Sequence, residues 1–459
     1  MQNGKCFHIA IVGSGPSGFY AAEALLGSGA DVQIDMFERL PTPFGLVRSG
    51  VAPDHPKLKQ PIRVFEDIAR SPRFNLLGNV TVGREVTVDE LRSAYHAVIF
   101  ACGAQNDRRM NIPGEDLRGS HTATEFVGWY NGHPDYRDRE FDLTQEVVAI
   151  IGQGNVAADV CRILMRPVDE LKSSDIAEHA LEALSQSRVR EVHVIGRRGP
   201  VQAKFTTKEL RELTSLSGTV SSAVPEQLQL SETCLAELAS SRSASAQKNV
   251  EVFRRAAGNS DDGNARRICF RFLASPVAVL GQECVEGLRL VHNRLDGEPF
   301  KQSAVATGQH EDLPCGLVFR SIGYRGIPIP GLPFDEVRGV VPNTAGRIDA
   351  DGVAVPGLYV TGWLKRGPSG IIGTNKADSI ETVDAVLSDV AESGLDALGL
   401  KRILPLVERR GGRVVSLSDW FAIDAAEVGR GAPRGKPREK FTRIGEMMSV
   451  LSSSSNNSA

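Results

Sequence analysis

The sequence predicts an α/β fold with two Rossmann-like units. Two Gly-rich turns, at residues 13–18 and 152–157, each follow a short β-rich run and precede a segment with helical periodicity. This strand–turn–helix order is typical of a parallel sheet with helices on its faces. In addition, a chain of 459 residues is too long for one ordinary core, because a domain commonly holds roughly 150 residues.

Composition and charge exclude several classes of protein. Apolar residues make up 41% of the chain and charged residues 24%, and the net charge is −3, so nothing favours nucleic acid or a membrane surface as a partner. No apolar run approaches the roughly 18–20 residues of a spanning helix. The first β-rich run begins at Phe7, which leaves no room for a signal or transit peptide. We therefore expect a cytoplasmic protein, or one already processed.

The cysteines argue against internal thiol chemistry. A dithiol–disulfide reductase needs two close thiols, and an Fe–S protein needs clustered thiolates. The chain has no C-x-x-C pair, and we expect reduced thiols buried as small hydrophobic side chains. An Fe–S centre that exchanges electrons with this chain would therefore lie on another protein. The seven cysteines are Cys6, Cys102, Cys161, Cys234, Cys269, Cys284 and Cys315.

The first turn fits the G-x-G-x-x-G fingerprint. Gly13 would make the tight turn, Gly15 would let the backbone approach a pyrophosphate, and Gly18 would let the helix pack on the strand. The free N–H groups at the helix start would then face the phosphates. Glu38 ends the next strand, at 32–36, where a carboxylate can accept hydrogen bonds from ribose hydroxyls.

The wider pattern favours FAD at this first site. An apolar strand at 98–101 ends in Cys102-Gly103, and a later one at 357–362 ends in Gly362. Together with the N-terminal fingerprint, these strand ends indicate a groove long enough for a flavin dinucleotide. Just before the helix that follows, Gly367, Gly370 and Gly373 would allow close approach of a flat ring. The positive end of that helix would stabilise an anionic reduced flavin.

The second turn, residues 152–157, is the G-x-G-x-x-A variant between a strand at 147–151 and a helix. The following strand leads into Arg197-Arg198 instead of an acidic residue. A carboxylate there would repel a 2′-phosphate, whereas guanidinium groups pair with it bidentately. This exchange predicts NADP(H) over NAD(H).

Several segments are open to a plainer interpretation. His55 lies in a loop, and Glu209 and Glu212 lie on a polar helix, so on spacing alone each is more often structural or solvated. The Ser/Ala-rich stretch at 214–265 is expected to form surface helix and loop. Residues 317–323 look like a strand that returns to the first domain, and 449–459 look like a disordered tail.

Four motifs carry a resemblance to a known family. They are P-T-P-F-G-L-V-R-S-G-V-A-P-D-H-P at 41–56, G-Q-G-N-V at 152–156, G-R-R-G-P at 196–200, and the segment 362–376 with G-T-N-K. With them the chain resembles the adrenodoxin reductase-type ferredoxin–NADP reductases, most strongly the actinobacterial members. The resemblance covers nearly the whole chain, to about residue 445.

The resemblance implies an NADP domain, 107–324, inserted into a discontinuous FAD domain, 1–106 plus 325–459. It also implies a monomer that passes electrons from NADPH through FAD to a ferredoxin, with the direction of flow left open. His55 and Glu212 match family positions near the nicotinamide and flavin, as catalytic residues. FAD would contact Ser17, Glu38, Leu46, Val82, Trp363, Gly370, Ile371 and Ile372. NADP would contact Gln153, Gly154, Asn155, Val156, Arg197, Arg198, Glu209 and Gly370.

The chain departs from the family pattern at 215–265, so the resemblance does not identify docking residues there. The nearest candidates for facing an acidic ferredoxin are Arg254, Arg255, Arg266 and Arg267. Two other functions stay open. One is an NADPH-dependent diaphorase, quinone reductase or monooxygenase, although nothing in the sequence builds an organic-substrate pocket. The other is a flavin-bearing binding or sensor protein, against which the two intact fingerprints argue.

Overall fold

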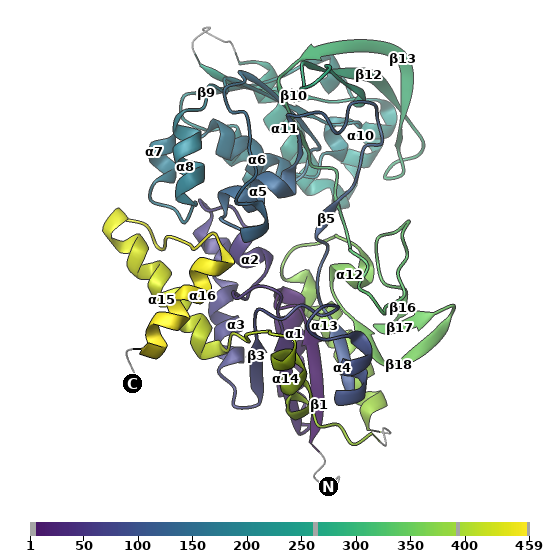
Figure 1. The fold of residues 1–459 in the computed structure, drawn as a ribbon. Coiled ribbons are helices and arrows are strands. Elements are labelled where there is room, and N and C mark those ends of the chain that lie inside the picture. The colour runs from purple at the N-terminus through teal and green to yellow at the C-terminus, as the bar shows by residue number, and fades with distance from the viewer. Residues whose placement is uncertain (1–5, 260–264, 392–394, 457–459) are drawn as a thin grey trace. The chain divides into compact units, whose positions relative to one another are not determined.

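The computed structural model describes residues 6–259, 265–391 and 395–456. Their contacts divide the chain into two compact units (Figure 1). Unit 1 comprises Met1–Asn106, Asn131–Pro134 and Gly323–Ala459, and unit 2 comprises Asp107–Tyr130 and Asp135–Ile322. The short segment at 131–134 was not part of the first domain expected from the sequence.

Unit 1 is built on a seven-stranded sheet of order β16-β17-β18-β4-β1-β2-β3. The strands from β18 to β3 run parallel, and β17 and β16 are antiparallel additions at one edge. Both faces are buried: Ile9 and Ile11 face one apolar cluster, and Ala10 and Val12 face another. The strands are β1 (Phe7–Val12), β2 (Val32–Phe37), β3 (Phe74–Leu77), β4 (Ala97–Phe100), β16 (Asn343–Thr344), β17 (Arg347–Ala350) and β18 (Val353–Val360).

The helices of unit 1 cover these two faces. Contacts between α1 and α13 are extensive, and they bring the start of the chain beside its last third. The helices are α1 (Pro16–Gly27), α2 (Leu46–Ser49), α3 (Pro61–Ala69), α4 (Val88–Ala94), α12 (Trp363–Arg366), α13 (Thr374–Val390), α14 (Leu400–Arg409), α15 (Leu417–Gly431) and α16 (Ile444–Asn456), with 3₁₀ turns η1 (Pro56–Lys59) and η6 (Ala432–Arg434).

Unit 2 has a six-stranded parallel sheet of order β6-β14-β7-β8-β10-β9. Its helices pack on one face, around Ile150 and Val194. An antiparallel sheet of β11, β12 and β13 packs on the other face, around Ala149 and Leu288. The strands are β6 (Ser120–Thr122), β7 (Val147–Ile151), β8 (Glu191–Ile195), β9 (Thr219–Ala223), β10 (Arg266–Arg271), β11 (Ala274–Leu280), β12 (Gly287–Asp296), β13 (Ser303–Pro314) and β14 (Leu317–Arg320).

The helices of unit 2 include α6, which begins at the second Gly-rich turn, and α9, which Thr206 caps by accepting a hydrogen bond from the Glu209 N–H. The helices are α5 (Ala123–Tyr130), α6 (Asn155–Met165), α7 (Val168–Leu171), α8 (Glu178–Ser185), α9 (Thr207–Leu213), α10 (Glu232–Ala239) and α11 (Ala244–Ala257). Short 3₁₀ turns are η3 (Pro200–Gln202), η4 (Pro225–Leu228) and η5 (Ser241–Ser243). The turn η2 (Pro134–Tyr136) and the short strand β5 (Asn106–Asp107) span the boundary between the units, and the short strand β15 (Tyr324–Arg325) belongs to unit 1.

Three expectations from the sequence are corrected. The stretch at 214–265 is more than surface structure: β9 is an edge strand of the sheet, and Phe253 of α11 is fully buried in the core. The apolar run at 317–320 forms β14 inside unit 2, so the chain leaves that unit only after it. The predicted disordered tail is helical as far as Asn456, because Leu451 packs in the core of unit 1. Residues 457–459 lie outside the described residues.

Within the described ranges, no helix combines the length and the apolarity that a bilayer crossing requires.

Candidate functional site

The first Gly-rich turn joins β1 to α1. Gly13 has φ +106°, and a Cβ on it would lie 2.7 Å from the Ala101 carbonyl oxygen. A Cβ on Gly18 would lie 2.1 Å from the Gly13 oxygen, so the fold itself requires both glycines. Gly15 differs, because a Cβ there would meet nothing within 4 Å. The turn therefore leaves open space at Gly15, where a phosphate could approach the backbone.

Glu38 follows β2 directly and is held against this turn. Its Oε2 accepts from the Ser14 N–H at 3.2 Å and from the Ser14 hydroxyl at 2.6 Å, and its Oε1 accepts from the Leu40 N–H at 3.0 Å. A carboxylate has about four acceptor positions, so capacity remains for a hydroxyl of a ligand. The charge is thus fixed in place and still able to bind.

The thiol nearest this turn is Cys102, whose Sγ donates to the Val12 oxygen at 3.3 Å. Burial, and then the negative charge of Glu38, raise the pKa of Cys102 to about 12. The thiol therefore stays protonated at neutral pH. All seven cysteines of the chain are free; three are buried and four are partly buried.

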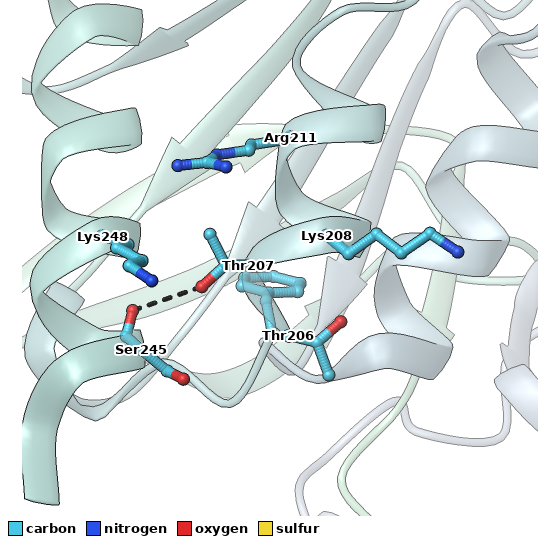
Figure 2. Close-up of a pocket in the computed structure, with 7 residues that line it drawn as sticks. Thr206, Thr207, Lys208, Arg211, Ser245 and Lys248 are labelled. Carbon is cyan, nitrogen blue, oxygen red and sulfur yellow. Dashed lines mark hydrogen bonds between the residues drawn. The ribbon is translucent and has the colours of Figure 1, made fainter.

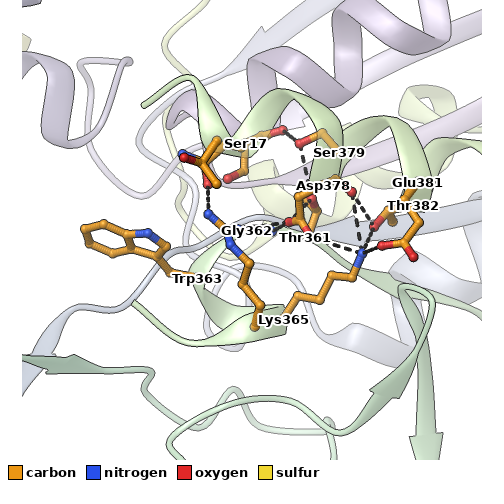
Figure 3. A network of polar contacts seen from close by, with 12 residues as sticks. Ser17, Thr361, Gly362, Trp363, Lys365, Asp378, Ser379, Glu381 and Thr382 are labelled. Carbon is orange, nitrogen blue, oxygen red and sulfur yellow. Dashed lines mark hydrogen bonds and ion pairs between the residues drawn. The ribbon is translucent and has the colours of Figure 1, made fainter. Parts of the chain in front are cut away.

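A network of polar contacts fixes the turn between β18 and α12 (Figure 3). The Asp378 side chain, on α13, accepts from the Gly362 N–H at 2.5 Å, from the Thr361 hydroxyl at 3.2 Å and from the Arg366 guanidinium at 3.0 Å. The buried Lys365 ammonium lies 3.1 Å from the other Asp378 oxygen. The Asp378 carboxylate thus fixes the whole turn between β18 and α12. The Trp363 ring projects away from this network.

The same turn meets the start of α1. Gly362 has φ +73°, and a Cβ on it would lie 2.1 Å from the Ser17 hydroxyl oxygen. The Ser379 hydroxyl donates to the Ser17 carbonyl at 3.0 Å, so α13 and α1 are tied together here. The fold therefore brings Ser17 close to the turn that carries Trp363, although the two are far apart in the sequence.

The other predicted FAD residues also lie in unit 1. Gly370 has φ +84° and precedes Ile371 and Ile372 in the loop before α13. Two of the predicted residues are large apolar side chains left open to solvent: Leu46 on α2 is 44% exposed and Ile371 is 71% exposed. Exposure of this kind fits residues that a bound apolar ring would cover. Val82 is partly buried in a loop that bridges to Val86.

The second turn repeats the pattern of the first in unit 2. Gly152 has φ +130°, and a Cβ on it would lie 2.1 Å from the Ser321 carbonyl oxygen. Gly154 is extended, with φ −120°, and a Cβ there would meet nothing within 4 Å. One glycine is required by the fold, and the other leaves open space beside the start of α6.

This contrast gives a paired prediction. Gly152→Ala should lower the free energy of unfolding by more than about 2 kcal/mol, because it combines a strained φ with a backbone clash. Gly154→Ala should change that free energy by less than about 1 kcal/mol yet weaken NADPH binding, since its methyl group would fill the open space. Denaturant unfolding and NADPH titration of both variants check this. Equal loss of stability in the two variants would contradict it.

Gln153 supports the turn from beneath. Its side-chain amide donates to the Arg271 carbonyl at 3.0 Å and to the Val194 carbonyl at 3.3 Å, so it ties the turn to β8 and β10. Asn155 and Val156 form the first turn of α6, and the Asn155 side chain accepts from the Thr206 N–H at 2.8 Å. The turn is therefore braced on both sides.

Arg197 and Arg198 follow β8 on a fixed backbone. The Arg197 oxygen accepts from the Asn293 side chain at 2.9 Å, and the Arg198 oxygen accepts from the Leu273 N–H at 3.0 Å. In the part of the chain that the structure describes, neither guanidinium forms an ion pair. The site therefore presents two positive charges that no carboxylate within the described ranges neutralises.

Sequence reasoning missed Arg162. This residue of α6 is fully buried, and its guanidinium lies 2.7 Å from Asp159, 3.6 Å from Glu209 and 3.9 Å from Glu212. Arg166 adds a contact to Glu212 at 3.2 Å. Arg162 in the helix of the second Gly-rich turn and Arg166 directly after it thus contact both predicted glutamates of α9. The sequence did contain a signal for Arg162, because a charged residue stands there among the apolar positions of α6.

The predicted catalytic residues fall on different units. His55 precedes η1 in unit 1 and is buried, whereas Glu212 lies on α9 in unit 2 and is partly exposed.

A basic pocket of about 530 Å³ lies between α9 and α11 in unit 2 (Figure 2). Arg211 and Lys248 project over it, and the Thr207 hydroxyl donates to the Ser245 oxygen at its base. Of the four arginines predicted to face a partner, Arg254 and Arg255 are exposed on α11. Arg266 donates to the Met165 carbonyl and Arg267 pairs with Glu191, so these two have internal partners.

Comparison with known proteins decides the family. Residues 7–215 match the pyridine nucleotide-disulphide oxidoreductase family. The chain is 46% identical to the mitochondrial NADPH:adrenodoxin oxidoreductase of Salvelinus fontinalis, over 96% of this chain and 90% of that one. It is 45% identical to the NADPH-ferredoxin reductase FprA of Mycobacterium tuberculosis (strain H37Rv), over 97% and 99%. The chain belongs to the family of NADPH-dependent ferredoxin and adrenodoxin reductases.

The fold agrees with that membership. The solved structure of Mycobacterium tuberculosis FprA in complex with NADPH matches with a TM-score of 0.91 and 44% identity, over 97% of this chain and 99% of that one. As a member of the family the chain is an FAD-dependent oxidoreductase whose cofactors are FAD and NADP. The predictions of family, fold class and cofactors are therefore confirmed.

Proposed function

We propose that this chain passes electrons from NADPH through FAD to a ferredoxin. The observation that carries the proposal is the contrast after the two Gly-rich turns: Glu38 follows one, and Arg197 and Arg198 follow the other. When bound, FAD takes up an electron pair as hydride and releases electrons singly, which an Fe–S acceptor requires. The names of the relatives as ferredoxin and adrenodoxin reductases support the same acceptor.

The FAD site would be built by unit 1. Open space at Gly15 and the remaining acceptor capacity of Glu38 suit a pyrophosphate and a ribose. The exposed side chains of Leu46 and Ile371 suit the face of a ring. We assign FAD to Gly13, Gly15, Ser17, Gly18, Glu38, Leu46, Val82, Trp363, Gly370, Ile371 and Ile372.

The NADP site would be built mainly by unit 2. The open Gly154 and the first turn of α6 suit a pyrophosphate, and the uncompensated guanidinium groups suit a 2′-phosphate. We assign NADP to Gln153, Gly154, Asn155, Val156, Arg197, Arg198, Glu209 and Gly370. The Gln153 side chain is engaged with the sheet, so its contribution would come from the backbone.

His55 and Glu212 would orient the nicotinamide or hold a proton during transfer, without a covalent nucleophile. The contacts of Glu212 with Arg166 and Arg162 support this role, because they hold the carboxylate in one position.

The proposal is tested on the purified protein. It should show flavin absorbance, NADPH should bleach that absorbance, and a ferredoxin should be reduced faster than a quinone at equal NADPH. Absence of flavin, or of bleaching, would reject the proposal. Faster turnover on quinones would favour a diaphorase or quinone reductase, and bleaching without turnover on any acceptor would favour a sensor.

The ferredoxin would dock at the basic pocket between α9 and α11. Lys208, Arg211 and Lys248 line it, and within the described ranges none of them forms an ion pair. A surface of this kind suits the acidic surface of a small Fe–S protein.

Reversing two of these charges tests the docking surface. In the double variant Arg211→Glu, Lys248→Glu the KM for ferredoxin should rise at least about tenfold, because like charges then face each other. The rate with ferricyanide, which needs no docked protein, should stay unchanged. The comparison variant is Arg254→Glu, Arg255→Glu, which reverses the two exposed arginines of α11 that the sequence offered as docking candidates. A larger rise in KM for this variant would place the docking surface at that end of α11. A KM that is insensitive to the first pair would place the docking surface elsewhere.

We further propose a cytoplasmic monomer. The seven free cysteines suit a reducing compartment. Both dinucleotide turns lie on one chain, so no second copy is needed to complete the sites. Cell fractionation and light scattering of the holoprotein test these two points.

A further inference from the structure

Three potential metal ligands meet on the sheet of unit 2, outside the proposed electron path. Glu191 and His193 alternate along β8, so their side chains point to the same face. Cys269 of β10 lies directly opposite His193 in the parallel register. The three positions thus form a compact triangle on two paired strands, which is a rigid support for a site.

The distances in this triangle are short. The His193 Nε2 lies 2.8 Å from the Glu191 Oε1, and the Cys269 Sγ lies 3.6 Å from the same oxygen. All three ligand atoms lie within 4.8 Å of one another. Tetrahedral zinc with bonds of about 2.0–2.3 Å places its ligand atoms roughly 3.3–3.5 Å apart. The Glu191–His193 pair would therefore open by about 0.5 Å, and the His193–Cys269 pair, at no more than 4.8 Å, would close by up to about 1.3 Å around an ion.

We propose that Glu191, His193 and Cys269 form a binding site for Zn²⁺. The set of one carboxylate oxygen, one imidazole nitrogen and one thiolate sulfur suits this borderline-soft cation and does not suit Mg²⁺ or Ca²⁺. On binding, Cys269 releases its thiol proton to solvent, and His193 keeps one proton, on Nδ1. Water fills the fourth position.

Neighbouring side chains support the ligands. The Ser222 hydroxyl donates to the Cys269 sulfur at 3.5 Å, and Arg267 donates to the second oxygen of Glu191. Such outer hydrogen bonds orient metal ligands. The Nδ1 of His193 is buried and has no hydrogen-bond partner in the structure, so His193 lacks the outer hydrogen bond that Cys269 and Glu191 have.

The charges around the site are close to balanced. The carboxylate and the thiolate offset the two charges of the ion. Arg271 is neutralised by its pair with Glu311, and the side chain of Arg267 is 49% exposed, so solvent screens it. The ion would cross-link β8 to β10, close to where β8 leads into Arg197. It would therefore stabilise unit 2 and leave the flavin site of unit 1 unchanged.

The test is Zn²⁺ binding to the FAD-loaded protein. Equilibrium dialysis with metal analysis should find one Zn²⁺ per chain, and Zn²⁺ but not Mg²⁺ should raise the melting temperature. Cys269→Ser should weaken Zn²⁺ binding at least tenfold. The matched control is Cys284→Ser, another partly buried cysteine of unit 2, which should bind as the wild type does.

A second measurement needs no variant. X-ray absorption at the zinc edge of the loaded wild-type protein should show one sulfur neighbour at about 2.3 Å and nitrogen or oxygen neighbours at about 2.0–2.1 Å. A zinc environment without sulfur, or equal Zn²⁺ affinity of Cys269→Ser and wild type, would overturn the proposal. Failure to bind any Zn²⁺ would also overturn it, whether or not the enzyme reduces ferredoxin.

Discussion

Replacing Arg197 and Arg198 together by alanine should raise the Kd for NADPH on the order of 10²–10⁴-fold and leave the Kd for NADH nearly unchanged. A hydrogen bond between charged groups contributes about 1.5–3 kcal/mol, so loss of two costs about 3–6 kcal/mol. Each 1.4 kcal/mol corresponds to about a tenfold change in Kd. The full effect is expected because no carboxylate of the described chain pairs with either guanidinium.

The control for this prediction is the NADH titration of the same variant. The two backbones are held by Asn293 and Leu273 through carbonyl oxygens, which alanine retains, so the turn should keep its shape. Fluorescence or absorbance titration with both nucleotides measures the two Kd values. An equal rise for NADPH and NADH would mean that the arginines shape the site and do not recognise the 2′-phosphate.

Replacing Arg162 by methionine should lower the free energy of unfolding of unit 2 by about 3–5 kcal/mol, because removing one partner of a buried ion pair leaves its carboxylate uncompensated. Glu209 is itself buried and lies 3.6 Å from this guanidinium. Methionine fills a similar volume, so little cavity is created. The loss of stability would therefore come mainly from the missing charge and hydrogen bonds of Arg162. Hydrogen exchange of the β7 and β8 amides measures the stability of unit 2 by itself.

The matched control is Arg166→Met, at the residue that directly follows α6. Its guanidinium contacts the partly exposed Glu212 at 3.2 Å, so its loss should cost much less. Similar exchange rates in Arg162→Met and wild type would show that the buried charge cluster contributes little to the stability of unit 2.

Local patterns predicted the parts of the fold that local chemistry determines. The alternation at Val32, Ile34 and Met36 and the apolar run at 147–151 correspond to β2 and β7, because hydrophobic periodicity follows burial directly. The glycine turns could also be predicted from the sequence, because Gly13 and Gly152 have backbone conformations that other residues rarely adopt. These features led to the confirmed fold class and cofactors.

Features that depend on partners distant in the sequence could not be predicted. β9 has small polar residues, and only its pairing with β10 makes it a strand. The role of Arg162 depends on α9 lying against α6. Likewise, Cys269 meets His193 only through the register of β8 and β10, which no local pattern encodes.

The turn held by Asp378 determines which positions around it can tolerate substitution. A single carboxylate takes donors from the backbone at Gly362, from a hydroxyl and from two cationic side chains. Loss of the Arg366 guanidinium leaves the other donors in place, so the more exposed Arg366 should be replaced at lower cost than the buried Lys365 or Asp378. Loss of the acceptor leaves all of these donors without their common partner at once. Asp378 is therefore the position of this turn at which we expect the fewest substitutions to be tolerated.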